Sequence, residues 1–272
     1  MTAAATDLLL AALDLARLAG QTAARHFRGD IAVERKGDGS PVTIADREAE
    51  RAARDWIARR FPEDAVLGEE FGETPGASGR RWLLDPIDGT RTFVRGVPLW
   101  GSLVAVIEGD VVLAGAACYP ALGEEIAAAP GRGCWHNGAR CAVSTIDTLA
   151  DAAVLTSEVV GFSEPETRRG WDRLSAASRT VRTWGDCYGY LLVATGRAEV
   201  MVDGRLNPWD AACFVPILQE AGGAMTDLAG RVSWNLHSAI GTNAALAGVA
   251  RACFAESPRW VPTRPTSGSE EN

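Results

Sequence analysis

The chain has few histidines and no cysteines spaced like the ligands of a zinc site. It contains three histidines and six cysteines, and no pair of cysteines has Cys-x-x-Cys spacing. Structural zinc sites draw their ligands from such pairs, so a zinc cluster is not expected. The cysteines are predicted to be small, largely buried thiols of a protein in a reducing compartment.

Basic residues are also in the minority. The chain has 27 Lys and Arg against 35 Asp and Glu, which gives a net charge of −8 at pH 7. This balance argues against general binding to nucleic acid or to anionic membranes. No apolar run approaches the ~20 residues of a membrane span, and residues 1–10 lack the basic segment of a signal peptide. We therefore expect a cytoplasmic protein.

The chain does have the length and the apolar patterning of a large folded protein. Its 272 residues are 47% hydrophobic, which is enough to bury a substantial core. Apolar residues at three- and four-residue steps predict helices at 6–27 and 44–60. Two apolar runs around Glu108-Gly109-Asp110 predict a β-hairpin over 99–119. Further strands are predicted at 66–67, 81–84, 125–129 and 134–135, so the first half is α+β.

The second half changes to an alternation of strands and helices, which predicts a mixed or parallel sheet covered by helices. Strands are predicted at 154–155, 181–182, 199–202 and 224–226, and helices at 164–178, 186–196, 209–221 and 243–255. We therefore divide the chain into an N-terminal α+β half (1–147), a C-terminal α/β half (148–256) and a polar tail (257–272) predicted to be disordered.

The stretch Asp85-Pro86-Ile87-Asp88-Gly89-Thr90 carries the main chemical signal. Two carboxylates and a backbone carbonyl are the hard oxygen ligands that Mg²⁺ prefers. The glycine and threonine that follow can present backbone N–H groups to a phosphate. Such a segment fits a phosphatase in which a carboxylate bridges two metal ions about 3.5–4 Å apart. Taken alone, it also fits an ordinary Asp-Pro turn.

Three further segments each have a plain reading when taken singly. Gly68-Glu69-Glu70 could be surface charge, Trp209-Asp210 could be a helix cap, and 36–46 could be a loop and a cap. In this order and spacing, however, the four segments resemble those of the inositol monophosphatase superfamily of Mg²⁺-dependent, lithium-sensitive phosphatases. The resemblance covers residues 6–255. It implies an active phosphomonoester hydrolase with a five-layer α/β/α/β/α sandwich, two or three Mg²⁺ per subunit, and assembly as a homodimer.

The resemblance also implies which residues hold the metal ions. Glu69, Asp85 and the carbonyl of Ile87 match the ligands of the first ion. Asp85, Asp88 and Asp210 match the ligands of the second. A third, weaker ion is implied near Glu69 through water.

The catalytic residues follow from the same resemblance. Thr90 and Asp46 are implied to orient and deprotonate the attacking water. Gly89 and Thr90 are implied to hold phosphate oxygens through backbone N–H groups, with Asp88 beside them in the substrate site. Because all these positions are intact, we expect an active enzyme that forms no covalent phosphoenzyme.

Three features resemble the histidinol-phosphate phosphatase branch. These are the Gly-x-Pro-x-Trp-Gly stretch ending at Gly101, Asp186 after Gly185, and Asp203 seven residues before Asp210. Asp186 and Asp203 would pair with the ammonium and imidazole of L-histidinol phosphate, and each could instead be a cap or turn residue. Asn207 is a weaker candidate for the same role.

Several interpretations stay open from the sequence. Arg182 could order the substrate pocket or make an ordinary ion pair, and Trp100 could cage the imidazole or fill the core. The substrate could instead be inositol 1-phosphate or a sugar phosphate such as fructose 1,6-bisphosphate. A non-catalytic binding protein on the same fold is the alternative from another class.

Overall fold

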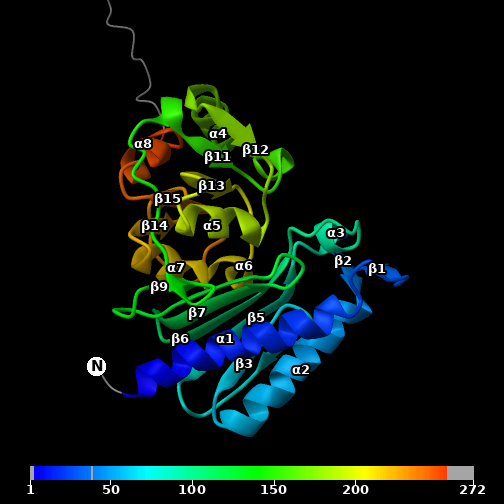
Figure 1. Ribbon diagram of the computed structural model, residues 1–272. Coiled ribbons are helices and arrows are strands. Elements are labelled where there is room, and N and C mark those ends of the chain that lie inside the picture. The colour runs from blue at the N-terminus through cyan, green and yellow to red at the C-terminus, as the bar shows by residue number, and fades with distance from the viewer. Residues whose placement is uncertain (1–2, 38, 256–272) are drawn as a thin grey trace, which may run out of the picture.

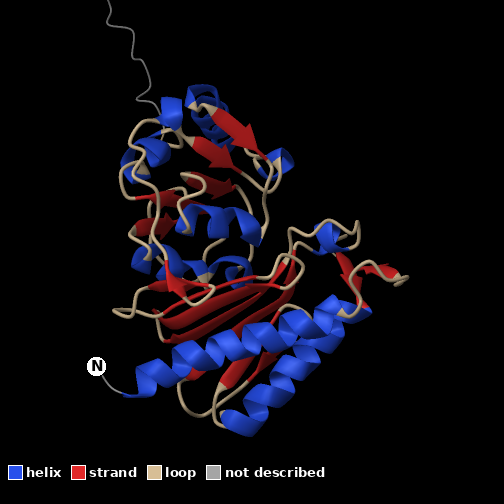
Figure 2. Cartoon of the chain, viewed as in Figure 1, coloured by secondary structure: helices blue, strands red, loops and turns tan. Residues whose placement is uncertain are grey.

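The computed structural model describes residues 3–37 and 39–255 (Figure 1). The tail predicted at 257–272 lies outside the described residues. Two sheets and three sets of helices alternate along the long direction of the molecule (Figures 1 and 2). This is the five-layer α/β/α/β/α sandwich that the sequence predicts. Among the described helices, none combines the length and the apolar character needed to cross a membrane.

Helices α1 (Ala3–Ala24) and α2 (Ile44–Arg60) form the first layer. The observed bounds of α2 are those predicted, and α1 begins and ends three residues earlier than predicted. Thr43 caps α2, and Pro62 follows shortly after its end. Small and aliphatic side chains spaced four apart on α2 face the sheet, because this spacing places them on one side of a helix. They are Ala45, Ala49, Ala53 and Ile57.

The second layer is an eight-stranded sheet that is antiparallel except where β3 pairs with β5. In spatial order its strands are β10 (Ala139–Arg140), β9 (Cys134–His136), β8 (Glu124–Ala128), β7 (Val111–Tyr119), β6 (Gly101–Glu108), β5 (Arg80–Asp88), β3 (Ala65–Gly68) and β4 (Gly72–Thr74). The predicted hairpin is β6 and β7. Both strands are almost wholly apolar because helices cover the sheet on both faces.

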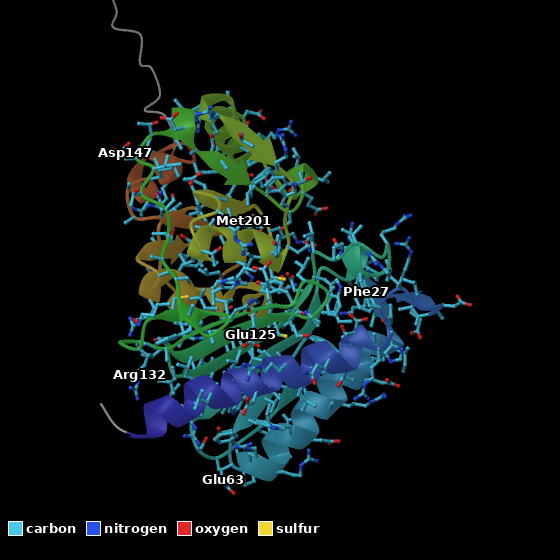
Figure 3. All side chains as sticks on the ribbon, in the orientation of Figure 1. Phe27, Glu63, Glu125, Arg132, Asp147 and Met201 are labelled. Carbon is cyan, nitrogen blue, oxygen red and sulfur yellow. The ribbon has the colours of Figure 1, made fainter. Side chains whose placement is uncertain are left out.

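The third layer contains α5 (Cys187–Ala194), α6 (Pro208–Ala211) and α7 (Phe214–Glu220). The single helix predicted at 209–221 is therefore two short helices. Helix α5 is buried nearly all round, as expected of a helix between two sheets. Met201, which Figure 3 labels, belongs to the same apolar core, and this core joins the two halves of the chain.

The fourth layer is a mixed five-stranded sheet, and α4 (Pro165–Ala177) and α8 (Ala247–Ala252) cover its outer face (Figure 1). In spatial order its strands are β12 (Thr180–Arg182), β11 (Ala153–Leu155), β13 (Val200–Asp203), β15 (Ala239–Asn243) and β14 (Gly223–Thr226). The sequence pattern missed β15, since Ala-Ile-Gly-Thr-Asn lacks a run of strand-forming residues. The helix predicted at 243–255 is correspondingly shorter.

Two short elements lie beside the junction of the layers. The two-stranded hairpin of β1 (Val33–Arg35) and β2 (Pro41–Thr43) leads into α2, and α3 (Thr90–Phe93) follows β5. Two 3₁₀ turns, Leu149–Asp151 and Val159–Gly161, flank β11. The acidic motif spans the end of β5 and the start of α3, and Ser40 and Pro41 of the hairpin line the same cavity as this motif.

The predicted boundary between the halves, after Asp147, falls between β10 and β11 (Figure 3). Residues before it already contact the second half: Val143 N donates to Ala221 O, and the Asn243 side chain donates to Ile146 O. The division itself stays a prediction.

Gly115 on β7 lets the two halves approach closely. A Cβ at this position would lie 2.2 Å from the carbonyl oxygen of Cys213, which is backbone and cannot turn aside. Gly115→Ala should therefore lower the free energy of unfolding by about 1–3 kcal/mol, the usual effect of overpacking. Urea denaturation monitored by tryptophan fluorescence measures this change.

Gly248→Ala is the matched control, because Gly248 lies in α8 and a Cβ there meets nothing within 4 Å. It should raise stability by about 0.5–1 kcal/mol, as alanine does in a helix. Equal denaturation midpoints for Gly115→Ala and the wild type would contradict this account of the interface.

Candidate active site

The acidic motif lies at the end of β5. The sequence pattern predicts a strand that closes at Asp85, but β5 continues through Pro86 to Asp88. Asp85 and Asp88 are three residues apart, so regular alternation would place their side chains on opposite faces. The pairing with β6 contains a register shift between the two aspartates. The irregularity lets both carboxylates turn toward the same space, as bulges near active sites do.

Local hydrogen bonds hold this irregular segment. Ile87 N donates to Asp85 Oδ1 at 3.0 Å, and Ser102 Oγ donates to the carbonyl of Pro86 at 2.6 Å. Ile87 itself is buried and packs in an apolar cluster with Phe93 and Trp100. The cluster fixes the backbone from which the Ile87 carbonyl projects.

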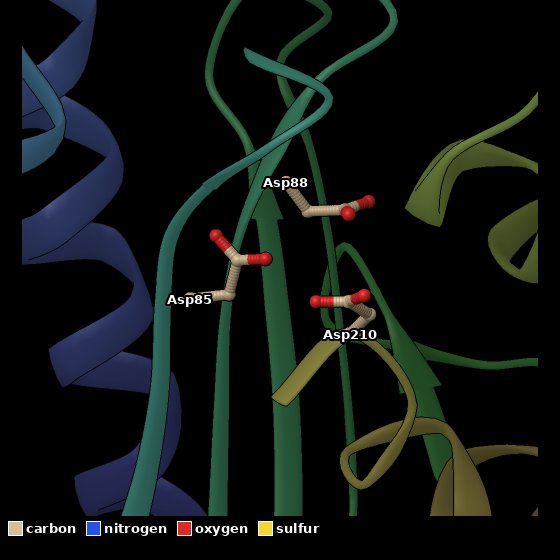
Figure 4. Close-up of side chains that lie close together, drawn as sticks. All are labelled: Asp85, Asp88 and Asp210. Carbon is tan, nitrogen blue, oxygen red and sulfur yellow. The ribbon is translucent and has the colours of Figure 1, made fainter. Parts of the chain in front are cut away.

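Asp210 comes from the other half of the chain. Asn207 and Asp210 form a capping box at the start of α6, in which Asp210 Oδ2 accepts the N–H of Asn207 at 2.7 Å. Asn207, not Asp210, is thus the N-cap of this helix. The box leaves Asp210 pointing at β5, and carboxylate oxygens of Asp85, Asp88 and Asp210 lie within 4.8 Å of one another (Figure 4).

These carboxylates repel one another. Burial and the charges of Glu69, Asp88 and Asp210 hold the pKa of Asp85 well above its usual range. Burial and the nearby Asp186 do the same for the pKa of Asp88, and burial raises the pKa of Asp210 to about 7. In the part of the chain that the structure describes, no Lys or Arg forms an ion pair with the three aspartates. Clustered oxygen donors without a cationic partner fit a hard divalent cation.

Glu69 approaches the cluster from the loop after β3. Glu50 on α2 is fully buried and accepts the N–H groups of Glu70 (2.7 Å) and Phe71 (3.2 Å), which fixes this loop. A Cβ at Gly68 would lie 2.1 Å from Glu50 Oε1, so the motif needs glycine here. Glu69 adds negative charge beside Asp85.

Lys36 neutralises part of this charge, a role the sequence reasoning missed. Its Nζ donates to Glu69 Oε1 at 2.7 Å and to Glu70 Oε1 at 2.6 Å. Burial acts to lower the pKa of Lys36, but the two glutamates outweigh it and raise that pKa. Burial is also the main reason that the pKa of Glu70 rises to about 7. The only sequence signal was the position of Lys36 at the head of its motif.

Thr90 and Asp46, the residues predicted to activate the water, are in contact. Thr90 Oγ1 lies 3.2 Å from Asp46 Oδ1 and 3.0 Å from the carbonyl of Ile87. Asp46 is fully buried and its other oxygen accepts both N–H and Oγ1–H of Thr43, each at 2.7 Å. Burial raises the pKa of Asp46. Asp46 therefore serves as the capping-box residue of α2 and also contacts Thr90.

Two adjoining cavities of about 290 Å³ and 270 Å³ open beside the cluster. Thr90 and Gly89 line the first with the metal-binding candidates. Asp186 lines both cavities, and Asp203 lines the second. Glu158, Arg91 and Arg205 line both as well, and no motif in the sequence points to these three residues.

Asp186 and Asp203 differ in the hydrogen bonds that their carboxylate oxygens accept within the protein. Asp186 Oδ2 accepts Thr92 Oγ1–H at 3.0 Å, and its backbone has a φ of 34°, which is uncommon for a residue other than glycine. Such strain often marks functional sites. Asp203 is buried and accepts Ser157 N–H on one oxygen (3.1 Å) and Tyr190 O–H on the other (2.8 Å). Burial raises the pKa of Asp203 to about 6.

Two open interpretations are resolved. Trp100 is fully buried and packs edge-on against Phe93, so it fills the core rather than caging a ligand. Arg182 forms no ion pair within the described residues. Its side chain donates to the carbonyl of Val181 and lies over the ring of Trp184.

Comparisons with known proteins show the family and the fold to which the chain is similar. A sequence model described as the inositol monophosphatase family matches residues 5–258. A histidinol-phosphatase of Chlorobaculum parvum is 46% identical over 84% of this chain and 88% of its own length. A histidinol-phosphatase of Mycobacterium tuberculosis is 39% identical over 88% and 95%. The solved structure of an IMPase of Thermotoga maritima is 31% identical, covers 91% of this chain and 96% of its own, and superposes with a TM-score of 0.82.

The carboxylate cluster makes a prediction about the protein without divalent cations. The pKa of folded Asp210, about 7, exceeds its ordinary value of 3.8, so the folded state binds this proton more tightly than the unfolded chain. The stability contributed by this group is therefore greatest below its ordinary pKa and is lost as the pH rises through 7. In EDTA, Asp210→Asn should thus unfold at a higher temperature than the wild type above pH 7, with the difference vanishing near pH 4.

With added Mg²⁺, the wild type should unfold at a higher temperature than Asp210→Asn. A cation that binds only the folded state stabilises it by about 2.7 kcal/mol at a hundred times its dissociation constant, and the variant has lost one of the proposed ligands. Differential scanning fluorimetry at several pH values and Mg²⁺ concentrations measures both effects. Identical melting curves for the two proteins under all conditions would refute the repulsion argument.

Proposed function

The chain belongs to the inositol monophosphatase family, and on this premise we propose that it hydrolyses L-histidinol phosphate to L-histidinol and phosphate in histidine biosynthesis. As a member it is a phosphomonoester hydrolase of a metal-dependent family. The observation that carries the substrate proposal is the higher identity to two histidinol-phosphatases than to the solved IMPase. The acidic cavity beside Asp186 supports it.

We propose that Mg²⁺ is the metal. Glu69, Asp85 and the Ile87 carbonyl would hold one ion, and Asp85, Asp88 and Asp210 a second. Bound there, Mg²⁺ supplies a Lewis acid that neutralises charge on the phosphate and on the attacking and leaving oxygens. Oxygen donors from carboxylates and one carbonyl suit this cation. The number of ions is part of the proposal, with a third near Glu69.

The chain's own residues position the nucleophile. When Thr90 donates its single hydroxyl proton to Asp46, a lone pair of Oγ1 is left to accept a proton from a water in the cavity. Asp46 cannot move to meet the water because Thr43 holds its other oxygen. Thr90 is therefore the group that orients the water, and Asp46 sets the direction of the Thr90 hydroxyl and draws the proton.

Backbone donors would hold the phosphate. Helix α3 begins at Thr90, and its first hydrogen bond runs from Phe93 N–H to the Gly89 carbonyl, so the N–H groups that precede Phe93 have no partner inside the helix. Gly89 and Thr90 line the same cavity as Asp88, so a phosphate bound by these N–H groups would lie against the carboxylate cluster. The phosphoryl group would then lie between the proposed metal ligands and the Thr90 hydroxyl.

The leaving group would occupy the adjoining cavity. Asp186 Oδ2 accepts Thr92 Oγ1–H, and Asp186 and Glu158 both line this cavity. The ammonium of histidinol would pair with Asp186 by a charge-assisted hydrogen bond. The buried Asp203 would receive the imidazole, an interaction that must share its oxygens with Ser157 and Tyr190.

A sugar or inositol phosphate is the alternative substrate. Arg91 and Arg205 line both cavities and could bind hydroxyl groups or a second phosphate. The alternative of a non-catalytic binding protein has less support, since every proposed metal ligand and the Thr90–Asp46 pair are present and converge.

We also propose a homodimer in the cytoplasm, as the resemblance and the free thiols suggest. Sedimentation equilibrium of the full chain measures the subunit number. A monomer at micromolar concentration would contradict the dimer without affecting the proposed reaction.

The substrate proposal predicts a clear preference in a phosphate-release assay. With Mg²⁺, kcat/KM for L-histidinol phosphate should exceed that for myo-inositol 1-phosphate and fructose 1,6-bisphosphate by about a hundredfold or more, because desolvated charge pairs contribute about 1.5–3 kcal/mol each. Asp186→Asn should lower kcat/KM for histidinol phosphate about tenfold or more while changing that for an uncharged ester little.

Two controls accompany this assay. Asp172→Asn, at an exposed carboxylate paired with Arg168, should leave every substrate unaffected. Asp85→Asn should abolish release from all of them with the fold intact. A preference for inositol phosphate would move the function to the alternative, and equal losses on both esters would remove Asp186 from substrate selection.

The water-orienting role of Thr90 predicts a split between two substitutions. Thr90→Val removes the hydroxyl at nearly constant volume and should lower kcat by about 10²–10⁴, with KM nearly unchanged. Thr90→Ser keeps the hydroxyl and should retain most of the activity. Steady-state kinetics with histidinol phosphate measures the split, and a Thr90→Val variant as active as Thr90→Ser would exclude this role.

A further inference from the structure

Two thiols are in contact outside the active site. Cys134 on β9 and Cys141 just after β10 have their Sγ atoms 3.4 Å apart. All six cysteines lie within the described residues and all are free, and this is the one pair among them in hydrogen-bond contact. Neither residue lines the cavities of the proposed active site. The contact therefore calls for an explanation that the phosphatase chemistry does not give.

The antiparallel pairing of β9 and β10 places Cys134 and Cys141 opposite each other. In β9 and β10, Trp135 pairs with Arg140, so the next pair along the ladder is Cys134 and Cys141. Cys141 N donates to the carbonyl of Cys134 at 3.1 Å. Facing residues in such hydrogen-bonded positions have Cα atoms about 5.5 Å apart. That distance lies in the range that a disulfide spans, so bonding needs only side-chain rotation.

Burial and charge distinguish the two thiols. Cys134 is 1% exposed, whereas Cys141 is half-buried and can be reached by a small molecule. A hydrogen bond from Cys134 and the nearby guanidinium of Arg197 lower the pKa of Cys141. The same hydrogen bond and burial raise the pKa of Cys134. Because Cys141 is the more exposed of the two thiols, we assign the first attack to Cys141, and Cys134 is in place to resolve its oxidised form.

We propose that Cys134 and Cys141 form a redox pair that hydrogen peroxide or a small organic hydroperoxide converts to a reversible disulfide. The Cys141 sulfur attacks one peroxide oxygen, the O–O bond breaks, and the leaving oxygen takes a proton to give water or an alcohol. Cys141 is then a sulfenic acid. The Cys134 sulfur attacks it, the S–S bond forms, the S–O bond breaks, and the departing hydroxide takes the Cys134 proton as water. Two thiols are oxidised and one peroxide is reduced.

The pair protects Cys141 from irreversible damage. A sulfenic acid that meets no thiol continues to sulfinic and sulfonic acids, whereas a neighbouring thiol stops oxidation at the disulfide. The segment also carries contacts to α7, because Glu220 accepts the N–H groups of Gly131 and Gly133. Keeping Cys141 at the reversible level spares this contact region a bulky charged group.

The first experiment uses the full chain. After treatment with hydrogen peroxide and alkylation of the remaining thiols, mass spectrometry of tryptic peptides should show one disulfide joining Cys134 to Cys141, with the other four cysteines alkylated. Dithiothreitol should restore six alkylated thiols. Six free thiols after peroxide treatment, or a disulfide between other cysteines, would overturn the proposal.

Variants test the order of the steps. Cys134→Ser should accumulate a sulfenic acid at Cys141 that dimedone traps, and prolonged peroxide should carry it to the sulfinic acid. Cys141→Ser should leave Cys134 unreacted. Cys253→Ser is the matched control, since Cys253 is half-buried and, among the described residues, its Sγ hydrogen-bonds to the Val249 carbonyl and not to another thiol. This variant should oxidise like the wild type.

The unoxidised variants should keep wild-type phosphatase activity, which verifies their fold. Dimedone trapped at Cys134 in the Cys141→Ser variant would reverse the assigned roles. An equal rate of sulfinic acid formation at Cys141 in the wild type and in Cys134→Ser would show that Cys134 gives no protection.

Discussion

Repulsion among closely spaced carboxylates, of which Asp85 is buried and Asp88 and Asp210 are half-buried, is the constraint around which this site is built. Three aspartates from two distant segments have oxygens within 4.8 Å of one another, and the fold must hold them there against their mutual charge. Each accepts one uncharged backbone donor: Ile87 N for Asp85, Cys187 N for Asp88 and Asn207 N for Asp210. Such donors orient a carboxylate without cancelling its charge, so the cluster keeps its affinity for a divalent cation. A lysine in place of these donors would neutralise the carboxylates and leave no binding site for a divalent cation.

Local sequence patterns indicate capping roles for Asp46 and Asp210, and the family resemblance indicates functional roles for them. The capping interactions explain why both interpretations fit the same residues. Asp46 and Asp210 each stand at the third position of a helix whose capping box they complete. A capping box restrains the carboxylate to one rotamer, and one of its oxygens remains free to act elsewhere. The cap is therefore the means by which the helix start positions a functional group. The capping box of α2 thus holds Asp46 in contact with Thr90, and the capping box of α6 holds Asp210 close to the aspartates of β5.

Periodic and contiguous features could be predicted from the sequence, and features set by distant partners could not. The bounds of α2 follow from four-residue apolar steps between Thr43 and Pro62. The extension of β5 through Pro86 does not, because proline argues against a strand and only pairing with β6 permits it. β15 is likewise held by its two neighbours rather than by its own composition. At the site, the segments that contain the candidate metal ligands could be identified from the sequence. The contact of Lys36 with Glu69 could not, because it depends on how the loop that carries Lys36 packs against the loop after β3.

The two ends of the substrate cavity carry opposite chemical demands, and this bears on specificity. The phosphate must approach a set of carboxylates, which only bound cations make favourable. In the proposed reaction the leaving group would meet Asp186, Glu158 and Asp203, where Arg91 and Arg205 offset part of the charge. Asp203 already accepts two of the roughly four hydrogen bonds that a carboxylate can accept, and its negative charge, like those of Asp186 and Glu158, would favour a cationic group over a neutral hydroxyl. A substrate with a positive leaving group therefore matches this cavity better than a polyol does.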